Sequence, residues 1–317
     1  MPLGSFYQAS LEGYTKDMAS PAIDINKLSK RYGHGEKYAL RDLTLQVEPG
    51  EVYGFLGPNG AGKSTAIRTL LNFLQPTSGS ANILGLDIVE SSTDVKSKVG
   101  YLSGELSLYR KLTGRQFLDY MADLQPLKHI DFQKKLIKDF GIKLDVPLQN
   151  LSKGNRQKIG LIQAFMHEPE VLILDEPTSG LDPLMQELFF SLVHEMQSKG
   201  SAVFVSSHNL TEVLRMCDRV GFIREGRLVA EESISKLQSR AAHSFIINFA
   251  KTAPMSDLKR IKGAKITSYS DTNVLVELNG DLSPLFAVLA KHKVLRLDPE
   301  EANLEREFLR FYNKEKK

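Results

Sequence analysis

The chain has 317 residues, of which 42% are apolar and 25% are charged. Such a composition is that of an ordinary soluble protein with a sizeable core, and the length favours two domains over one. The net charge of +3, from 41 basic and 38 acidic residues, is too balanced for a nucleic-acid binder.

The single cysteine, Cys217, excludes an internal disulfide and a cysteine metal cage, and it fits a reducing, cytoplasmic setting. The longest apolar runs, such as Val171–Leu174 and Leu188–Val193, are far shorter than the roughly 18 residues of a membrane span. A membrane role therefore needs a separate partner. Residues 1–20 lack the pattern of a secretory signal, and we expect a disordered tail or a remnant of cloning there.

The first elements are short segments that alternate apolar and polar residues, at Ile23–Ile25, Leu43–Val47 and Val52–Phe55. Because glycine and proline interrupt them, they predict a small antiparallel sheet. The strand Val52–Leu56 then leads through a glycine-rich turn into a helix expected from about Lys63 to Leu74.

The turn between this strand and this helix matches the phosphate-loop pattern G-x-x-x-x-G-K-[ST]. It reads Gly57-Pro58-Asn59-Gly60-Ala61-Gly62-Lys63-Ser64 and is followed by Thr65. Its backbone N–H groups and the helix N-terminus suit the β-phosphate of a nucleotide. We expect Lys63 to reach the β- and γ-phosphates and Ser64 to place its hydroxyl on Mg²⁺. These nine residues form the candidate nucleotide site.

Further along, residues 114–143 show a helical pattern, in which apolar residues recur at spacings of three and four. The β-rich runs Val171–Leu174 and Ala202–Ser206 are separated by an amphipathic stretch, Pro183–Gln197. This βαβ order predicts a parallel sheet covered by helices.

Two carboxylates, Asp175 and Glu176, follow the apolar run Val171–Leu174 directly. A buried parallel strand would place them at its carboxyl end, where ligands bind. Asp175 is therefore our candidate for holding Mg²⁺, and Glu176 for polarising an attacking water.

The composition changes again after about Ser239, and we expect a separate domain at residues 240–317. Four segments there read as strands and one as a helix, which predicts a small α+β unit with helices on one face. The segments are Phe245–Phe249, Lys265–Ser268, Val274–Leu278, Leu285–Leu289 (the helix) and Val294–Leu297. Near the end, Leu304, Phe308 and Phe311 would share one helical face. We expect this unit to support dimer assembly or regulation and not catalysis.

These motifs, together with Leu151-Ser152-Lys153-Gly154-Asn155, resemble the ATPase subunits of ABC transporters. The family signature reads L-S-G-G-Q, so Lys153 and Asn155 depart from it. The resemblance covers nearly all of residues 23–235. It implies an α/β P-loop NTPase cassette at residues 21–235, with a parallel sheet core, an antiparallel β subdomain and a helical subdomain, before the C-terminal α+β domain.

The resemblance also implies roles for particular residues, with ATP and Mg²⁺ as ligands. Ser152 and Gly154 would face the γ-phosphate bound by the opposite subunit, and Ser179–Asp182 looks like the loop that bridges the two sites. His208 looks like the family's switch histidine. Tyr32 resembles the aromatic residue that stacks on adenine, with Tyr38 as a competing candidate.

One motif of the family is altered. Where the family commonly has Tyr-Leu-Pro-Gln or Tyr-Leu-Pro-Glu, this chain has Tyr101-Leu102-Ser103-Gly104. Gly104 has no side chain to bind Mg²⁺ or water, so Glu105 or an ordered water is the candidate substitute.

The resemblance as a whole implies an ATP-hydrolysing subunit of an ABC transporter. Two cassettes, identical or homologous, would bind ATP between them and drive a separate membrane permease from its cytoplasmic face. The short cassette and C-terminal extension look most like exporters of drugs, antibiotics or lipid-like cargo. The alternatives are a non-transport ABC ATPase acting on ribosomes or DNA, and a regulator that binds ATP without turnover.

Overall fold

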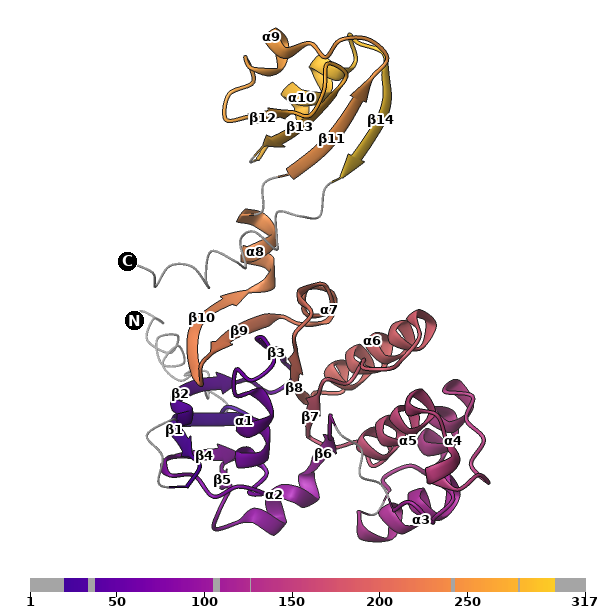
Figure 1. The fold of residues 1–317 in the computed structure, drawn as a ribbon. Coiled ribbons are helices and arrows are strands. Elements are labelled where there is room, and N and C mark those ends of the chain that lie inside the picture. The colour runs from indigo at the N-terminus through magenta and orange to yellow at the C-terminus, as the bar shows by residue number, and fades with distance from the viewer. Residues whose placement is uncertain are drawn as a thin grey trace, which may run out of the picture.

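The computed structural model describes residues 20–33, 38–104, 109–125, 127–240, 243–278 and 280–299. Its centre is a six-stranded sheet, drawn in Figure 1 between the antiparallel sheet and the helices of the chain's middle third. In spatial order the strands are β10 (Arg227–Ser233), β9 (Arg219–Arg224), β3 (Val52–Leu56), β8 (Ala202–Ser207), β7 (Val171–Asp175) and β6 (Val99–Leu102). All neighbours are parallel except β10 and β9, which confirms the predicted parallel sheet.

Strands β3, β7 and β8 are buried along their whole length, as expected for parallel strands covered on both faces. Successive residues of β3 enter different cores because side chains alternate across a strand. Val52 and Leu56 pack with the helical side of the molecule, in one cluster with Ile159. Tyr53 and Phe55 pack on the opposite face with Ile67, which lies in α1 (Lys63–Leu70).

The antiparallel sheet consists, in spatial order, of β2 (Tyr38–Val47), β1 (Ile23–Arg31), β4 (Ser78–Ile83) and β5 (Leu86–Asp87). The first two predicted segments lie in it. The third does not: Val52–Phe55 belongs to β3, at the centre of the parallel sheet. The prediction was wrong because Tyr53 was counted as a polar residue on an exposed face, whereas its ring is fully buried in the core.

Among the remaining helices of this part of the chain, those over residues 114–139, 153–165 and 183–198 were predicted, and the other four elements were not. The full set is, in chain order, α2 (Ser92–Lys98), α3 (Gly114–Leu124), α4 (Ile130–Asp139), the 3₁₀ turn η1 (Leu148–Asn150), α5 (Lys153–Phe165), α6 (Pro183–Ser198), α7 (Leu210–Met216) and α8 (Ile234–Arg240). Helix α1 ends at Leu70, before Asn72 takes a left-handed φ of 52°. The helical stretch 114–143 is two helices, because Gln125 is extended before a proline.

Side-chain caps fix where several of these helices begin. Thr113 and Gln116 form a reciprocal capping box at α3, and Asp182 accepts a hydrogen bond from the Met185 amide 3.0 Å away at α6. The Ser152 hydroxyl accepts from the Asn155 amide at 3.2 Å, as the sequence predicts for the start of α5. Each such cap satisfies a backbone donor that the helix itself leaves free.

The C-terminal segment forms a third sheet, drawn beyond α8 in Figure 1. Its antiparallel strands are, in spatial order, β12 (Lys265–Ser268), β13 (Asn273–Leu278), β11 (His243–Phe249) and β14 (Val294–Pro299). Helices α9 (Met255–Leu258) and α10 (Ser283–Leu289) contribute Leu258 and Leu285 to one cluster with Ile247 and Val276. The predicted strands, helix and α+β class are therefore confirmed.

Three expectations concern parts of the chain outside the described residues. They are the tail at residues 1–19, Glu105, and the apolar stripe of Leu304, Phe308 and Phe311.

His167, just after α5, gives the fold a pH-sensitive point. It is 5% exposed, and burial, together with the nearby charge of Lys128, lowers its pKa from 6.5 to about 4. Protonation of the unfolded chain therefore begins near pH 6.5 while the folded ring stays neutral. We expect the free energy of unfolding to fall by about 2 kcal/mol between pH 7.5 and 5 from this group.

Urea unfolding of the wild type and of His167→Gln at both pH values measures this term. The variant has no titratable group at this position, so its loss of stability on acidification should be smaller by about that amount. Equal losses in the two proteins would show that His167 does not contribute.

Candidate active site

The loop between β3 and α1 requires glycine at the residue that precedes Lys63. Gly62 has a φ of 113°, and a Cβ added there would lie 2.6 Å from the carbonyl oxygen of Ala39. A side chain is therefore excluded both by the backbone conformation and by the neighbouring strand. The loop is followed directly by the N-terminus of α1. The backbone N–H groups of the loop and of this helix end therefore favour binding of an anion beside Lys63.

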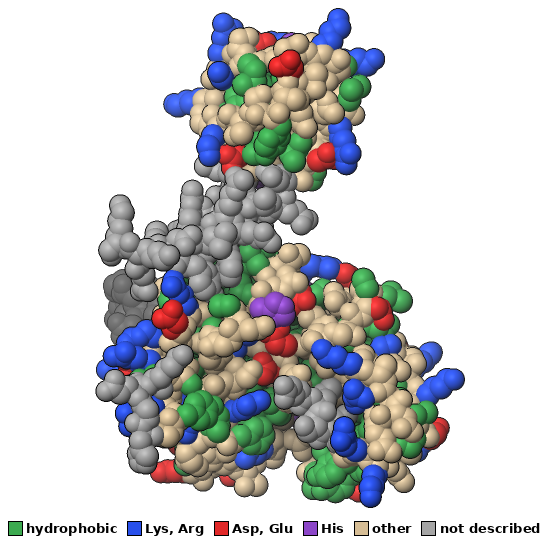
Figure 2. Space-filling view, viewed as in Figure 1, with side chains coloured by type: hydrophobic (Ala, Val, Ile, Leu, Met, Phe, Trp, Pro, Cys, Tyr) green, Lys and Arg blue, Asp and Glu red, His purple; other side chains and the backbone are tan. Residues whose placement is uncertain are grey.

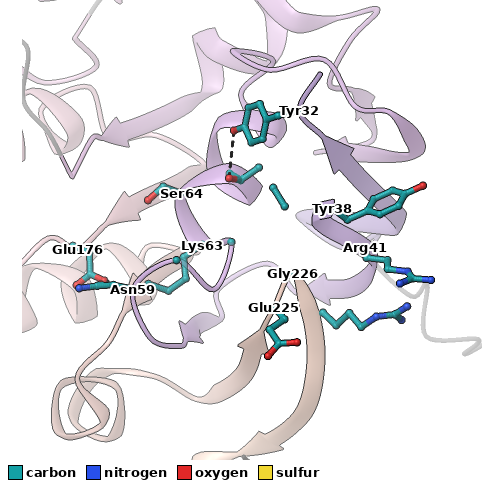
Figure 3. A pocket seen from close by; sticks show the side chains of 14 residues that line it. Tyr32, Tyr38, Arg41, Asn59, Lys63, Ser64, Glu176, Glu225 and Gly226 are labelled. Atoms are coloured by element: carbon teal, nitrogen blue, oxygen red, sulfur yellow. Dashed lines mark hydrogen bonds and ion pairs between the residues drawn. The ribbon is translucent and has the colours of Figure 1, made fainter. Parts of the chain in front are cut away.

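A cavity of about 960 Å³ opens beside this loop (Figure 3). Lys63, Asn59 and Glu176 lie at one end of it, and Tyr38 and Arg41 at the other. Most of the predicted nucleotide-site residues contribute to its wall. The lining residues are Tyr32, Tyr38, Ala39, Arg41, Asn59, Gly60, Gly62, Lys63, Ser64, Thr65, Glu176, Glu225, Gly226 and Arg227.

At the inner end of the cavity three side chains in contact join the phosphate loop to the carboxyl ends of β7 and β8. The Lys63 ammonium lies 3.2 Å from Oε1 of Glu176, whose other oxygen lies 2.7 Å from Nδ1 of His208. Lys63 also donates to the Gly57 carbonyl at 2.7 Å and is only 6% exposed. The three predicted residues therefore form one connected group.

Ser206, at the end of β8, holds both carboxylate residues and was not anticipated from the sequence. Its hydroxyl donates to Oδ1 of Asp175 at 2.5 Å, and the Glu176 amide lies 3.2 Å from both its hydroxyl and its carbonyl oxygen. These bonds support the left-handed φ of 50° at Glu176. The available signal was the pair of serines, Ser206 and Ser207, that ends the otherwise apolar strand β8.

The two residues predicted to hold a divalent cation offer one hydroxyl, Ser64, and one carboxylate, Asp175. No cluster of three or more histidine, cysteine, aspartate or glutamate side chains occurs among the described residues. Such a sparse set of oxygen donors fits Mg²⁺, which keeps water and substrate phosphates as its other ligands. Gly104 lies against Asp175: a Cβ there would be 3.4 Å from Oδ2, so no side chain intervenes from that position.

Two tyrosines line the outer part of the cavity. Guanidinium groups flank Tyr38, with the Cζ atoms of Arg31 and Arg41 at 5.8 and 5.6 Å from its ring centre. The Tyr32 ring is half exposed and lies over the start of α1, its hydroxyl 3.5 Å from that of Thr65 (Figure 3). A cation also lies over Tyr32, with the Lys30 ammonium 5.8 Å from its ring centre, but Tyr32 is more exposed than Tyr38. Tyr32 is therefore better placed to offer a face to a planar base.

The signature-like segment does not reach this cavity. Ser152 and Gly154 are absent from its lining, and the first turn of α5 packs instead against the loop between β7 and α6. A Cβ on Gly154 would lie 2.7 Å from the Gly180 carbonyl oxygen, so glycine permits this close approach. Within the chain, the structure thus separates the signature from the phosphate loop.

A parallel sheet with a glycine-rich loop, a buried lysine and paired carboxylates at its carboxyl edge is the architecture of a P-loop NTPase. A family model described as ABC transporter matches residues 40–179. The linearmycin resistance ATP-binding protein LnrL of Bacillus subtilis (strain 168) is 30% identical over 304 residues, covering 90% of this chain and 97% of LnrL. The chain belongs to the ABC transporter ATP-binding family.

The relationship extends to larger relatives and to solved structures. The chain is 36% identical over 227 residues to the probable multidrug ABC transporter ATP-binding protein YbhF of Escherichia coli (strain K12), covering 70% of this chain but only 39% of YbhF. A solved ATP-binding subunit of an ABC transporter shares 28% identity at a TM-score of 0.64, over 68% of this chain and 92% of that one. A dimeric cassette bound to ADP and Pi has a TM-score of 0.62 at 21% identity, over 67% and 98%, and supports the fold alone.

None of the helices in the described part of the chain is long and apolar enough to cross a membrane. Figure 2 shows lysine and arginine side chains spread over the cassette surface in view, with a histidine above acidic side chains near its centre.

Proposed function

We propose that this chain binds ATP with Mg²⁺ and hydrolyses it to drive a separate membrane permease. The observation that carries the proposal is the connected group of Lys63, Glu176 and His208 at the inner end of the cavity. Lysine supplies positive charge for the transferred phosphoryl group, and the carboxylate is suited to accept a proton from the attacking water. His208 holds the second oxygen of Glu176 and thereby orients it.

The cation would be held by Ser64 and Asp175 and would neutralise charge on the phosphates. The chain itself supplies positioning: the loop N–H groups bind the phosphates, and Ser206 fixes both carboxylate residues. Phosphoryl transfer leaves little covalent work for protein groups, so such positioning is the main contribution expected of them.

We further propose that the active unit is a dimer of cassettes. The separation of Ser152 and Gly154 from the cavity supports this, because their backbone donors then need a phosphate from another chain. The names of YbhF and LnrL, a probable multidrug ABC transporter ATP-binding protein and a linearmycin resistance ATP-binding protein, support an exporter. We place the chain at the cytoplasmic face of the membrane through its permease.

Two measurements test the proposal. The purified chain should release phosphate from ATP in the presence of Mg²⁺, and omission of the cation should abolish release. Cross-linking in intact cells followed by mass spectrometry should recover an integral membrane protein. Recovery of ribosomal proteins instead would favour a non-transport ABC ATPase, and binding without hydrolysis would favour a regulator.

Base recognition gives a separate prediction. Tyr32→Ala should weaken ATP binding roughly tenfold, because stacking on an aromatic ring contributes on the order of 1–3 kcal/mol per base. Tyr32→Phe keeps the ring and should bind like the wild type. Calorimetry with a non-hydrolysable ATP analogue gives both values, with Tyr38→Ala as the matched control. A larger effect at Tyr38 would reassign the stacking residue.

We also propose residues 240–317 as an accessory domain that affects assembly or regulation. The C-terminal sheet has a hydrophobic cluster of its own, whose buried members in the described part of the chain run from Ile247 to Leu289, with Phe245 packed against them. A chain ending at Arg240 should keep its ATP affinity while its ATP-driven dimerisation or basal turnover changes. Calorimetry and size-exclusion chromatography measure these. Lost affinity in a folded variant would show that the segment completes the nucleotide site.

A further inference from the structure

Lys153, which replaces the first glycine of the family signature L-S-G-G-Q, makes a specific contact. Its ammonium donates a hydrogen bond to the Ser179 hydroxyl at 3.0 Å. Its aliphatic stem lies over Gly180, with Cγ, Cδ and Cε each 3.5 Å from where a Cβ of that glycine would be. Lysine thus spans from the first turn of α5 to the loop between β7 and α6.

Two neighbours reinforce this junction. Gly154 lies so close to the Gly180 carbonyl that a Cβ would be 2.7 Å from its oxygen. Gln157, one turn further along α5 and 3% exposed, donates to the Pro177 carbonyl at 2.8 Å. The first turns of α5 therefore contact this loop through Lys153, Gly154 and Gln157. Gly154 and Gln157 contact only backbone atoms of the loop.

The loop leads directly to the candidate base. It begins at Glu176, three residues before Ser179, and Glu176 is held by Lys63 and His208. A displacement of α5 is therefore transmitted over a short, closely packed path to the carboxylate that faces the phosphate loop. In the dimer proposed above, α5 of a chain would contact the nucleotide bound by its partner. Glu176 of the same chain would act on the nucleotide bound by its own phosphate loop.

Glycine, which the family signature carries at this position, has no side chain with which to reach Ser179. We infer that Lys153 is a positioning residue, which couples the first turn of α5 to the loop of Glu176 and so links the two nucleotide sites of a dimer. The inference rests on the proposed function. The competing possibility is that Lys153 places its charge directly on the partner's phosphate.

Lys153→Met tests the inference because methionine keeps the apolar stem and removes the donor. We expect kcat to fall about tenfold, the size of effect for losing a hydrogen bond to a charged group, with ATP affinity unchanged within about twofold. Ser179→Ala should reproduce the loss, and the double variant should be no worse than either single one. Lys153→Arg, which retains a charged donor, should recover most of kcat.

The matched control is Lys134→Met on α4, whose ammonium pairs with Asp131 and not with the loop. Additive losses in the double variant, or unchanged kcat in Lys153→Met, would overturn the coupling. Weaker ATP affinity in Lys153→Met but not in Ser179→Ala would assign Lys153 to the phosphate instead. If the wild type and the Lys134 control both lack turnover, the proposed function fails. The same set of single and double variants can then be compared by urea unfolding. Additive losses of stability from Lys153→Met and Ser179→Ala would show that these two side chains do not interact.

Discussion

Glu176→Gln should lower ATP turnover by about a thousandfold while leaving ATP binding intact, because an amide cannot accept the proton that a general base removes. Glutamine has nearly the same shape and removes only the negative charge that pairs with Lys63, which lies 3.2 Å from Oε1 in the wild type. Bound ATP would then persist, and the closed dimer should accumulate. Steady-state phosphate release and size-exclusion chromatography with ATP measure the two effects.

His208→Ala serves as the comparison for this variant. It removes the partner 2.7 Å from the other oxygen of Glu176 but leaves the carboxylate, so we expect a smaller loss of turnover. Near-normal turnover in Glu176→Gln would rule out this glutamate as the principal base, and another group would have to orient the water.

Mixing two inactive variants should restore activity if the sites are shared between chains. Lys63→Ala removes the charge at the phosphate loop, and Ser152→Arg crowds the start of α5, where the serine hydroxyl now caps the helix. Each variant alone should retain below about 1% of turnover. Their heterodimer combines the phosphate loop of one chain with the signature of the other and keeps one intact site. Phosphate release by the mixture, against each parent, shows the recovery.

The complementation needs subunit exchange, which mass photometry of differently tagged chains verifies. If heterodimers form and turnover stays at the level of the parents, assembly in trans or the independence of the two sites must be abandoned. A mixture with Glu176→Gln in place of Lys63→Ala provides a second combination with the same geometry.

The sequence predicted those parts of the fold that depend on local pattern. The phosphate loop, the burial of Val171–Leu174 and the cap at Ser152 each follow from neighbouring residues, and the structure contains them. Val52–Phe55 was assigned to the wrong sheet, because alternation over four residues cannot reveal that both faces of a strand are buried. Strand pairing is decided by distant segments.

Two contacts of the site that join distant segments of the chain could not be predicted from the sequence. Ser206 meets Asp175 across 31 positions of the chain, and Lys153 meets Ser179 across 26. Ser206 belongs to no pattern that predicts its partner, and the resemblance of Ser179–Asp182 to the family's bridging loop does not indicate a contact with Lys153. The register of β7 against β8 and the packing of α5 bring these pairs together. The role of each site residue stays a prediction until the variants above are measured.

The ion pair between Lys63 and Glu176 would also affect release of the inorganic phosphate that the proposed hydrolysis produces. A carboxylate tethered beside the ammonium is an intramolecular competitor for every phosphate that approaches it, with a high effective concentration. Inorganic phosphate must displace Glu176 to regain Lys63, which offsets part of its binding free energy. If the chain hydrolyses ATP as proposed, this competition would weaken the rebinding of inorganic phosphate to Lys63 after each cycle.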